Sequence, residues 1–387
     1  MAKIAFFCIP AWGHTNPTLA VVRALTDMGH EVVYYSFPPF KEAIEAVGAR
    51  FVSCEVGDVS EAAVNGGAVA RDILVSTRLI ADTTLALEDM ALNSLRAFGP
   101  DVIVADSVAF WGKLYALRLG IPHVCSTTTF AFNRHSAKVM KQGLGELFGM
   151  LLKLPRAGRL LKPLRDAGYP VKSVMEIVRS DDSVPTVVYT SKQFQPCAET
   201  FPDTYVFVGP CPRPVSRPMA KPERPLVFVS MGTVLEGEDR FYENCAEALG
   251  DGRYEVVMAV GESRAPQRLP ANVHVYRRVD QIAVLRVADA FITHCGMNSA
   301  SEALYHGVPL ITRPLTPEEG GVAARAEALG AGLRLDGVTP AAIRKAVDEV
   351  VANPKYRRAA RAIGEDFRQC GGAGAAADVI LRYAGAV

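Results

Sequence analysis

Short apolar segments alternate with longer amphipathic segments along most of the chain. In the first half, Lys3–Ile9 and Asp101–Asp106 are typical of buried strands, and Thr15–Met28 and Leu85–Phe98 are typical of helices. Strands that alternate with helices are joined by right-handed crossovers into a parallel sheet. The other elements expected here are strands at Glu31–Phe37, Arg50–Glu55 and His123–Thr128 and a helix at about 111–119. The pattern predicts a doubly wound α/β domain.

The second half repeats this order of elements without repeating the sequence. Its expected strands are Leu226–Ser230, Glu255–Val260, Val273–Tyr276, Ala290–Thr293 and Pro309–Thr312, with helical patterns between them, one near 241–249. Residues 209–225 separate the halves and contain six prolines, which oppose both helix and sheet. We therefore predict two Rossmann-like domains, at 1–208 and 226–370, joined by a linker at 209–225. Such folds bind ligands outside the carboxyl ends of their strands, so a cleft between the domains is expected.

Composition excludes several classes of protein. The 42 Lys and Arg residues balance 41 Asp and Glu residues among 387, so nothing favours general attraction to nucleic acid. The eight cysteines are scattered, and contexts such as Phe7-Cys8-Ile9 predict reduced, buried thiols. The apolar start, Ile4–Ile9, is too short for a signal peptide, and no run approaches the roughly 20 apolar residues of a membrane span. We expect a cytoplasmic protein.

Residues 135–172 differ from the rest of the pattern. They contain eight Lys or Arg and two acidic residues, interleaved with Leu144, Leu147, Phe148, Leu151 and Leu152. One interpretation is an acceptor-side lid or a membrane-surface helix. The other, which we favour for the charges, is a helical insertion with one core face and one solvated basic face. The leucines are candidates to line an acceptor pocket in either case.

His14 lies in the first strand-to-helix turn, within Pro10-Ala-Trp-Gly-His-Thr-Asn-Pro17, which lacks the G-x-G-x-x-G of a dinucleotide site. A helix start disfavours a cation, so a histidine there tends to stay neutral, as a general base must. Asp106 ends the strand Val102–Asp106 at the same edge of the sheet. Its carboxylate could hold one ring nitrogen of His14 and fix the tautomer. The alternatives are a structural histidine and an aspartate that caps the next helix.

A second strand-to-helix turn, Ala290-Phe-Ile-Thr-His-Cys-Gly-Met-Asn-Ser299, carries polar groups where a helix begins. Asn298, Ser299 and free backbone N–H groups could bind an anion there. Glu302 follows nearly one turn later and could accept two hydrogen bonds from a ribose diol. The alternative is a capping box from Ser299 to Glu302. Thr233, in the parallel turn after Leu226–Ser230, could add a hydroxyl donor.

The sequence contains no D-x-D and no cluster of His, Cys and Asp with the spacing of metal ligands. We therefore expect neither a cofactor nor a required metal, and assign the neutralisation of a diphosphate to helix N-termini, His294 and hydroxyl groups.

The motifs PAWGHTNP at 10–17 and THCGMNSASEALYHGVP at 293–309 resemble those of the family-1 nucleotide-sugar glycosyltransferases of the GT-B fold. The bacterial macrolide and natural-product enzymes are the subgroup that the chain resembles, over essentially its whole length. The resemblance implies an inverting transfer, with His14 as catalytic base and Asp106 as its partner. It also implies that the last helix, within 371–387, returns to the first domain.

The resemblance further assigns substrate contacts. Diphosphate contacts match Thr233, His294, Asn298 and Ser299, the ribose ligand matches Glu302, and Gln281 flanks the base pocket. Glu318, with Glu319 next to it, matches the position that holds sugar hydroxyls. Donor contacts are also expected from Val279 and Gly296, and acceptor contacts from Trp12, Phe110, Phe130 and Phe148.

Two positions depart from the pattern of the family. Arg278 stands where an aromatic ring usually stacks on the nucleobase, although a guanidinium plane can also stack. Glu319 stands where glutamine is usual, and a carboxylate accepts hydrogen bonds but does not donate them. These departures bear on the base, uracil or thymine, and on the sugar.

The expected function is transfer of a hexosyl group from a UDP- or dTDP-sugar to a hydroxyl of a small natural product such as a macrolide, polyketide or phenol. A non-hydrolysing sugar-nucleotide epimerase has the same architecture, but it needs no acceptor pocket. A non-catalytic auxiliary protein of this fold would have no reason to keep His14, Asp106 and Glu302 together. Both remain alternatives.

Overall fold

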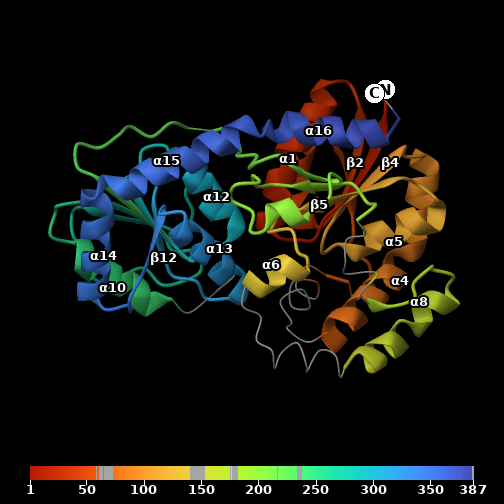
Figure 1. Cartoon of the computed structure of the whole chain (residues 1–387), viewed down its shortest axis with the longest axis horizontal. Coiled ribbons are helices and arrows are strands. Elements are labelled where there is room, and N and C mark those ends of the chain that lie inside the picture. The colour runs from red at the N-terminus through yellow and green to blue at the C-terminus, as the bar shows by residue number, and fades with distance from the viewer. Residues whose placement is uncertain are drawn as a thin grey trace. The chain divides into compact units, whose positions relative to one another are not determined.

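The chain forms two compact α/β units, described here from a computed structural model (Figure 1). The first unit contains residues 1–190, 197–211 and 370–387, and the second contains 191–196 and 212–369. One of the passages between the units lies within the proline-rich segment, after residue 211, and the last helix belongs to the first unit. The described residues are 1–57, 59–60, 64, 73–139, 153–174, 176, 182–215, 217–232 and 238–385.

The first unit is built on a seven-stranded parallel sheet in the order β3-β2-β1-β4-β5-β6-β7. The strands are β1 (Lys3–Phe7), β2 (Glu31–Ser36), β3 (Arg50–Ser53), β4 (Val102–Asp106), β5 (His123–Thr127), β6 (Thr186–Val188) and β7 (Tyr205–Phe207). The sequence patterns predict the first five within one or two residues at each end. They miss β6 and β7, because three residues are too few to show a periodicity.

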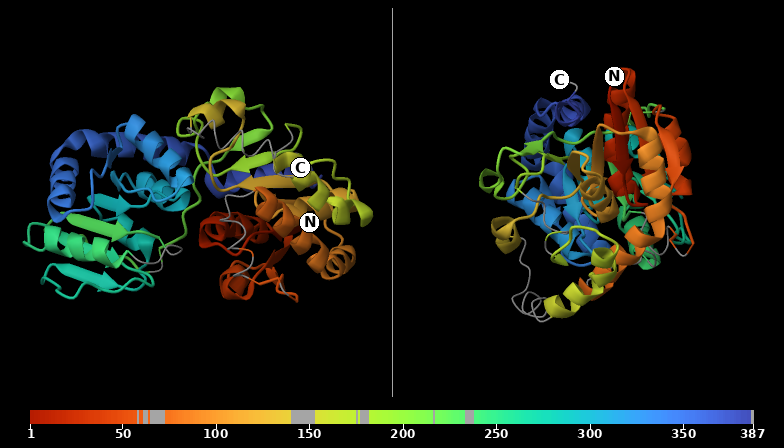
Figure 2. Two further views of the ribbon diagram at one scale, coloured as in Figure 1. Left: turned by 90° about the horizontal axis from the view of Figure 1, so that it is seen from below. Right: turned by 90° about the vertical axis from the view of Figure 1, so that its right-hand side faces the viewer.

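Helices cover both faces of this sheet. Its helices are α1 (Trp12–Asp27), α2 (Lys41–Glu45), α4 (Ile73–Phe98), α5 (Phe110–Leu119), α6 (Arg134–Val139), α8 (Lys162–Asp166) and α16 (Gly372–Tyr383), with short 3₁₀ turns η1 (Pro38–Phe40) and η2 (Ala198–Thr200). α1 packs against α16 on one face, and α4 packs against α5 on the other (Figures 1 and 2). Because both faces are covered, the central strands β1 and β4 are almost wholly buried, as parallel sheets usually are.

Helix α4 begins twelve residues before the predicted start at Leu85. Its first half contains several threonines, which lower helix propensity. Two of them, Thr77 and Thr84, donate their hydroxyl hydrogens to the carbonyls of Ile73 and Ile80, four residues earlier. These hydroxyls are satisfied inside the helix, so the segment stays helical despite its weak local preference.

The second unit is a six-stranded parallel sheet in the order β10-β9-β8-β11-β12-β13. Its strands are β8 (Leu226–Ser230), β9 (Glu255–Ala259), β10 (Val273–Tyr276), β11 (Ala290–Thr293), β12 (Leu310–Thr312) and β13 (Gly332–Arg334). Its helices are α10 (Asp239–Leu249), α11 (Gln281–Leu285), α12 (Met297–Tyr305), α13 (Pro317–Ala328), α14 (Pro340–Ala352) and α15 (Pro354–Gln369). α10 packs on α14, and α12 packs on α15. Two doubly wound parallel units confirm the predicted fold class.

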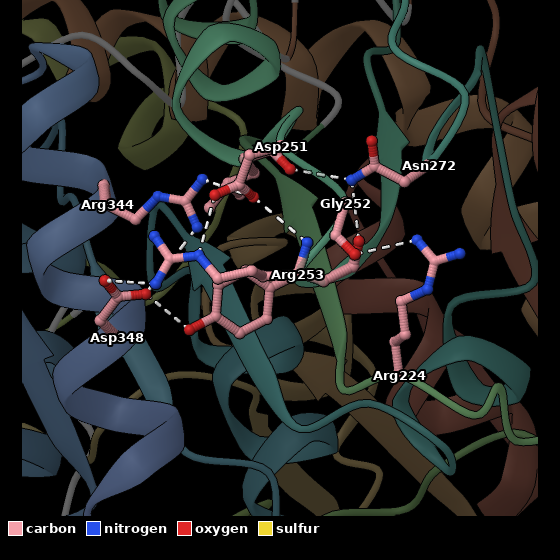
Figure 3. A network of polar contacts seen from close by, with 9 residues as sticks. Arg224, Asp251, Gly252, Arg253, Asn272, Arg344 and Asp348 are labelled. Atoms are coloured by element: carbon pink, nitrogen blue, oxygen red, sulfur yellow. Dashed lines mark hydrogen bonds and ion pairs between the residues drawn. The ribbon is translucent and has the colours of Figure 1, made fainter.

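An ionic network fastens α14 to the segment before β9 (Figure 3). Asp251 lies between two guanidinium groups, with Oδ2 2.8 Å from Arg253 Nε and Oδ1 2.8 Å from Arg344 Nη2. On α14, one turn after Arg344, Asp348 accepts a hydrogen bond of 2.6 Å from the hydroxyl of Tyr254. The network lies at the amino ends of the strands, on the side opposite the carboxyl ends, where these folds bind ligands.

The described part of the basic 135–172 segment packs as a helical insertion. Ala157, Leu161 and Leu164 are buried in the core of the first unit, whereas Arg156 and Arg165 are exposed. This confirms the core-and-solvent interpretation for residues 153–172. The predicted contact Phe148 and the leucines at 144, 147, 151 and 152 lie outside the described residues.

Two further expectations concern compartment and cysteines. Within the described ranges, no helix is both long and apolar enough to cross a bilayer. Cys8, Cys54, Cys211, Cys245 and Cys295 are buried free thiols, and burial raises the pKa of each. The buried-thiol interpretation of Cys8 is therefore confirmed.

Candidate active site

The two strand-to-helix turns singled out in the sequence occupy equivalent places in the two sheets. In the first unit β1 is the strand at which the order reverses, with β2 on one side and β4 on the other; in the second unit β8 lies in the same way between β9 and β11. Helices leave the sheet in opposite directions at such a point, which opens a crevice at the carboxyl ends of the strands. The candidate residues of each unit are concentrated there.

His14 lies in the first turn of α1, just after β1. α1 begins three residues earlier than predicted, so His14 is the third residue of the helix. Its Nδ1 lies 2.8 Å from Oδ2 of Asp106, which ends the neighbouring strand β4. The side chain of His14 is 17% exposed and that of Asp106 is 1% exposed. A buried carboxylate thus holds a ring that reaches the surface of the unit.

The second oxygen of Asp106 holds the turn that follows β4. Oδ1 accepts a hydrogen bond of 2.9 Å from the backbone N–H of Val108. Ala109 is the N-cap of α5, and it makes no side-chain capping bond. The interpretation of Asp106 as a helix cap is therefore wrong, because its carboxylate joins a tight turn to His14 instead.

Thr128 completes the surroundings of His14 Nδ1 and was missed in the sequence. It directly follows β5, the next strand after β4, and its Oγ1 lies 3.0 Å from Nδ1. Its place at the end of a predicted strand is the signal that could have identified Thr128, since the carboxyl ends of adjacent parallel strands meet at one edge of the sheet.

The aromatic residues predicted to contact an acceptor differ in exposure. Trp12 and Phe110 are half-buried near the starts of α1 and α5, and the Trp12 ring centroid lies 4.6 Å from that of Phe40. Phe130 is buried. Two residues later Phe132 is 51% exposed, in the segment between β5 and α6. Phe132, which we did not predict, is the more accessible ring of that segment.

In the second unit, the turn after β11 holds the backbone in an unusual conformation. Cys295 has φ +66°, a left-handed value that is costly for a residue with a Cβ. Gly296 is the N-cap of α12 and provides no side chain to cap the helix. Among the described residues, no side chain caps the first backbone N–H groups of α12, which is the condition for an anion site. Asn298 and Ser299 are the second and third residues of this helix, as predicted.

Glu302 is 2% exposed and is held by two side-chain amides. Gln281 Nε2 donates to Oε2 at 2.6 Å, and Asn298 Nδ2 donates to Oε1 at 3.1 Å. Burial raises the pKa of Glu302, while these hydrogen bonds and the positive charge of Arg213 act in the opposite direction. Ser299 lies inside the helix and is not its N-cap. The alternative of a Ser299–Glu302 capping box is therefore wrong.

The His294 ring lies in a space that two glycines leave open. A Cβ on Gly232, after β8, would come within 2.8 Å of this ring, and one on Gly296 within 2.6 Å. Because β8 and β11 are neighbours, the turns that follow them enclose the ring from two sides. Burial lowers the pKa of His294, and the negative charge of Glu319 acts against this shift. The predicted contact Thr233 lies outside the described residues.

Arg278 and Val279 lie between the end of β10 and the start of α11. Arg278 is exposed, and it has no ion-pair or hydrogen-bond partner in the described part of the chain. Its neighbour Arg277 is paired with Glu262. An unpaired guanidinium is thus presented close to Gln281, the first residue of α11.

Glu318 and Glu319 lie in the first turn of α13, and they differ in their exposure and their contacts. Glu318 is exposed, whereas Glu319 is buried and forms a capping box with Thr316. Glu319 Oε2 accepts backbone hydrogen bonds of 2.7 Å from Leu315 and 2.9 Å from Thr316. One of its oxygens is therefore already used inside the protein.

Within the described ranges, no group of three His, Cys, Asp or Glu side chains is arranged to hold a metal ion.

Comparisons with known proteins agree on one family. The family model of UDP-glucoronosyl and UDP-glucosyl transferase matches residues 213–365. The chain is 32% identical to the NDP-glycosyltransferase YjiC of Bacillus licheniformis, over 98% of this chain and 97% of that protein. It is 31% identical to the demethyllactenocin mycarosyltransferase of Streptomyces fradiae, over 98% and 86%.

Solved structures extend the likeness to three dimensions. The calicheamicin glycosyltransferase CalG4 superposes with a TM-score of 0.81 at 30% identity, over all of this chain and 98% of that chain. The match therefore includes both sheets, with the turns that carry His14 and Glu302. The chain belongs to the UDP-glucoronosyl and UDP-glucosyl transferase family and is a glycosyltransferase of the GT-B fold.

Proposed function

We propose that this glycosyltransferase inverts the anomeric centre while it moves a hexosyl group from a UDP- or dTDP-sugar to a hydroxyl of a small natural product. The observation that carries the proposal is the contact of His14 with the buried Asp106 at the point where the strand order reverses. Asp106 makes His14 a better base, because it orients the ring and stabilises the cation that forms.

The reaction is a single displacement. His14 takes the proton of the acceptor hydroxyl as that oxygen forms a bond to the anomeric carbon. The bond from this carbon to the diphosphate oxygen breaks on the opposite face, and the nucleoside diphosphate leaves with the bonding electrons. No carboxylate has to form a covalent sugar intermediate, in contrast to retaining glycosidases.

The second unit would hold the donor. The start of α12, with the glycine Gly296 as its N-cap, and the His294 ring are suited to the diphosphate, and the amide-held carboxylate of Glu302 is suited to ribose hydroxyls. The unpaired guanidinium of Arg278 can stack on the base. Glu318, in the first turn of α13, is our candidate for the sugar hydroxyls.

The first unit would hold the acceptor. Trp12, Phe110 and Phe132 offer aromatic surface on segments that follow β1, β4 and β5. The names of two relatives, a demethyllactenocin mycarosyltransferase and a calicheamicin glycosyltransferase, support a natural product as the acceptor class. An apolar, ring-containing acceptor fits these side chains.

The test compares His14→Ala with the wild type on two phenols of different acidity. Donors are UDP-glucose and dTDP-glucose, and acceptors are 4-nitrophenol and 4-methoxyphenol; release of nucleoside diphosphate and the mass of the product are measured. Loss of a general base lowers kcat by about 10²–10⁴. We expect this loss for 4-methoxyphenol and a much smaller one for 4-nitrophenol, which ionises without help.

His30→Ala is the matched control. His30 belongs to the same unit, but it lies just before β2, where its Nδ1 accepts a hydrogen bond from the backbone of Ala2. Its replacement should leave the ratio of the two phenol rates unchanged. If His14→Ala slows both phenols by the same factor and also lowers the melting temperature, His14 is structural and the proposal fails.

A further inference from the structure

Two oxygens, and not one, lie within hydrogen-bond distance of His14 Nδ1: Asp106 Oδ2 at 2.8 Å and Thr128 Oγ1 at 3.0 Å. We propose that Thr128 is a positioning residue, which shares the Nδ1 proton with Asp106 and so sets the tautomer and the base strength of His14. This inference rests on the proposed function, because it assigns a second support to the same base.

The direction of the hydrogen bonds follows from the chemistry of the three groups. An ionised carboxylate accepts hydrogen bonds and has none to donate. The 2.8 Å contact with Asp106 therefore requires a hydrogen on Nδ1 of His14. Because Nδ1 then has no lone pair to offer, the hydroxyl of Thr128 accepts from the same N–H. The lone pair of the neutral ring is consequently on Nε2, which is the nitrogen that would take the acceptor proton.

The sheet supports this arrangement. Asp106 of β4 is paired in register with Ser126 of β5, and Thr128 follows two residues later. The backbone N–H of Ser107 donates to the carbonyl of Ser126 at 2.9 Å, which extends the pairing beyond β4. Thr128 is 4% exposed. Its oxygen is thus held by a buried segment within hydrogen-bond distance of Nδ1.

The second acceptor matters more for the charged ring than for the neutral one. A hydrogen bond from a charged donor is roughly twice as strong as one from a neutral donor. The contact with Thr128 therefore stabilises the imidazolium that forms during transfer more than the resting imidazole. Its loss would weaken the base without removing it.

Three further titratable groups of the described residues interact with Asp106, and they stay uncharged in the range of the assay. Cys8 lies at the end of β1, Tyr34 on β2, and Tyr189 just after β6, and each interacts electrostatically with Asp106. Burial raises the pKa of all three. At His14 Nδ1, Asp106 thus provides a carboxylate and Thr128 a neutral hydroxyl.

The test is the pH dependence of kcat/KM for UDP-glucose and 4-methoxyphenol in Thr128→Val and Thr128→Ser. Valine keeps the branched shape and removes the hydroxyl, whereas serine keeps the hydroxyl. In Thr128→Val the plateau value of kcat/KM should fall about 3- to 10-fold. The acidic limb of the pH profile should move by about half a pH unit to lower pH, because the imidazolium loses one hydrogen-bond acceptor. Thr128→Ser should restore both.

Thr127→Val is the matched control, since Thr127 is the buried neighbour whose hydroxyl contacts Cys125 Sγ at 3.7 Å. It should leave the acidic limb in place. The inference is overturned if Thr128→Val keeps the wild-type profile, or if it loses rate and melting temperature while the limb stays fixed. His14→Ala distinguishes the two levels of the argument: if that variant keeps full activity, it is the proposed function that fails.

A second measurement does not depend on activity or on the folding of a variant. The ¹⁵N spectrum of histidine-labelled wild-type protein reports which ring nitrogen of His14 carries the hydrogen at neutral pH. A proton on Nδ1 is expected. A proton on Nε2 alone would overturn the inference, because Nδ1 would then carry no hydrogen for Asp106 and Thr128 to share.

Discussion

Glu302→Gln provides the sharpest test of the donor site. In the wild type each carboxylate oxygen accepts one amide hydrogen, from Gln281 on one side and Asn298 on the other, and each keeps a second lone pair. A glutamine has one oxygen and one NH₂ group, so one of the two amides would face a donor in place of an acceptor. The variant therefore loses both the negative charge and half of the acceptors that a ribose diol needs.

The magnitude follows from the value of one hydrogen bond to a charged group, about 1.5–3 kcal/mol. This corresponds to a rise of about 10- to 150-fold in the Kd of UDP. dTDP lacks the ribose 2′-hydroxyl, so the substitution can remove fewer of its hydrogen bonds to residue 302. The Kd of dTDP should therefore rise less than that of UDP. The ratio of the two effects distinguishes recognition of a diol from a general loss of affinity.

Isothermal titration of UDP and dTDP into the wild type and the variant measures both values. Glu327→Gln is the matched control, because Glu327 belongs to the same unit and its carboxylate accepts a 2.6 Å hydrogen bond from the Thr312 hydroxyl. It should leave both affinities unchanged. The reasoning is refuted if Glu302→Gln binds UDP as tightly as the wild type while its melting temperature falls, since Glu302 would then serve α12 and not the ribose.

Three further predictions concern the sugar site, metal dependence and the ionic network. Glu319→Ala should lower the free energy of unfolding, measured in urea, by about 1 kcal/mol. Glu319→Gln should keep the wild-type value, because a glutamine oxygen can accept both backbone hydrogen bonds. An altered ranking of hexosyl donors in Glu319→Gln would refute a role limited to capping. Transferase rates should persist in excess EDTA, because the N-terminus of α12 provides positive potential and the His294 ring can provide an N–H donor for the diphosphate. Complete loss that Mg²⁺ or Mn²⁺ restores would refute this. Arg253 and then Arg344 hold the pKa of Asp251 well below its usual range, so its contribution to stability is complete at neutral pH, begins to fall at the pKa of an unfolded aspartate and is lost only as the pH passes the lower pKa of the folded protein. Asp251→Asn should therefore lower the melting temperature more at pH 7 than near pH 3, and an equal effect at both pH values would contradict the assignment.

Local sequence determined most of the fold. The apolar runs that became β1, β4, β8 and β11 are buried on both faces, so their composition alone identifies them as central strands of parallel sheets. One passage between the units, after residue 211, falls within the proline-rich segment 209–225, whereas the passages at the two ends of 191–196 have no such mark in the sequence. The strands that were missed, β6, β7 and β13, have three residues each and depend on their neighbours for order.

For the candidate site, too, local sequence predicted one part and the tertiary structure decided the other. Sequence placed His14 and Asp106 at strand ends and Glu302 one turn into α12, because the strand-to-helix pattern gives the position of a residue along its own element. Only the tertiary structure decided which groups meet. The order β2-β1-β4-β5 brings Thr128 to His14 across 114 positions of the chain, and the packing of α11 near α12 brings Gln281 to Glu302. Such contacts follow from strand order and helix packing, which depend on the whole core, so no local pattern of residues contains them.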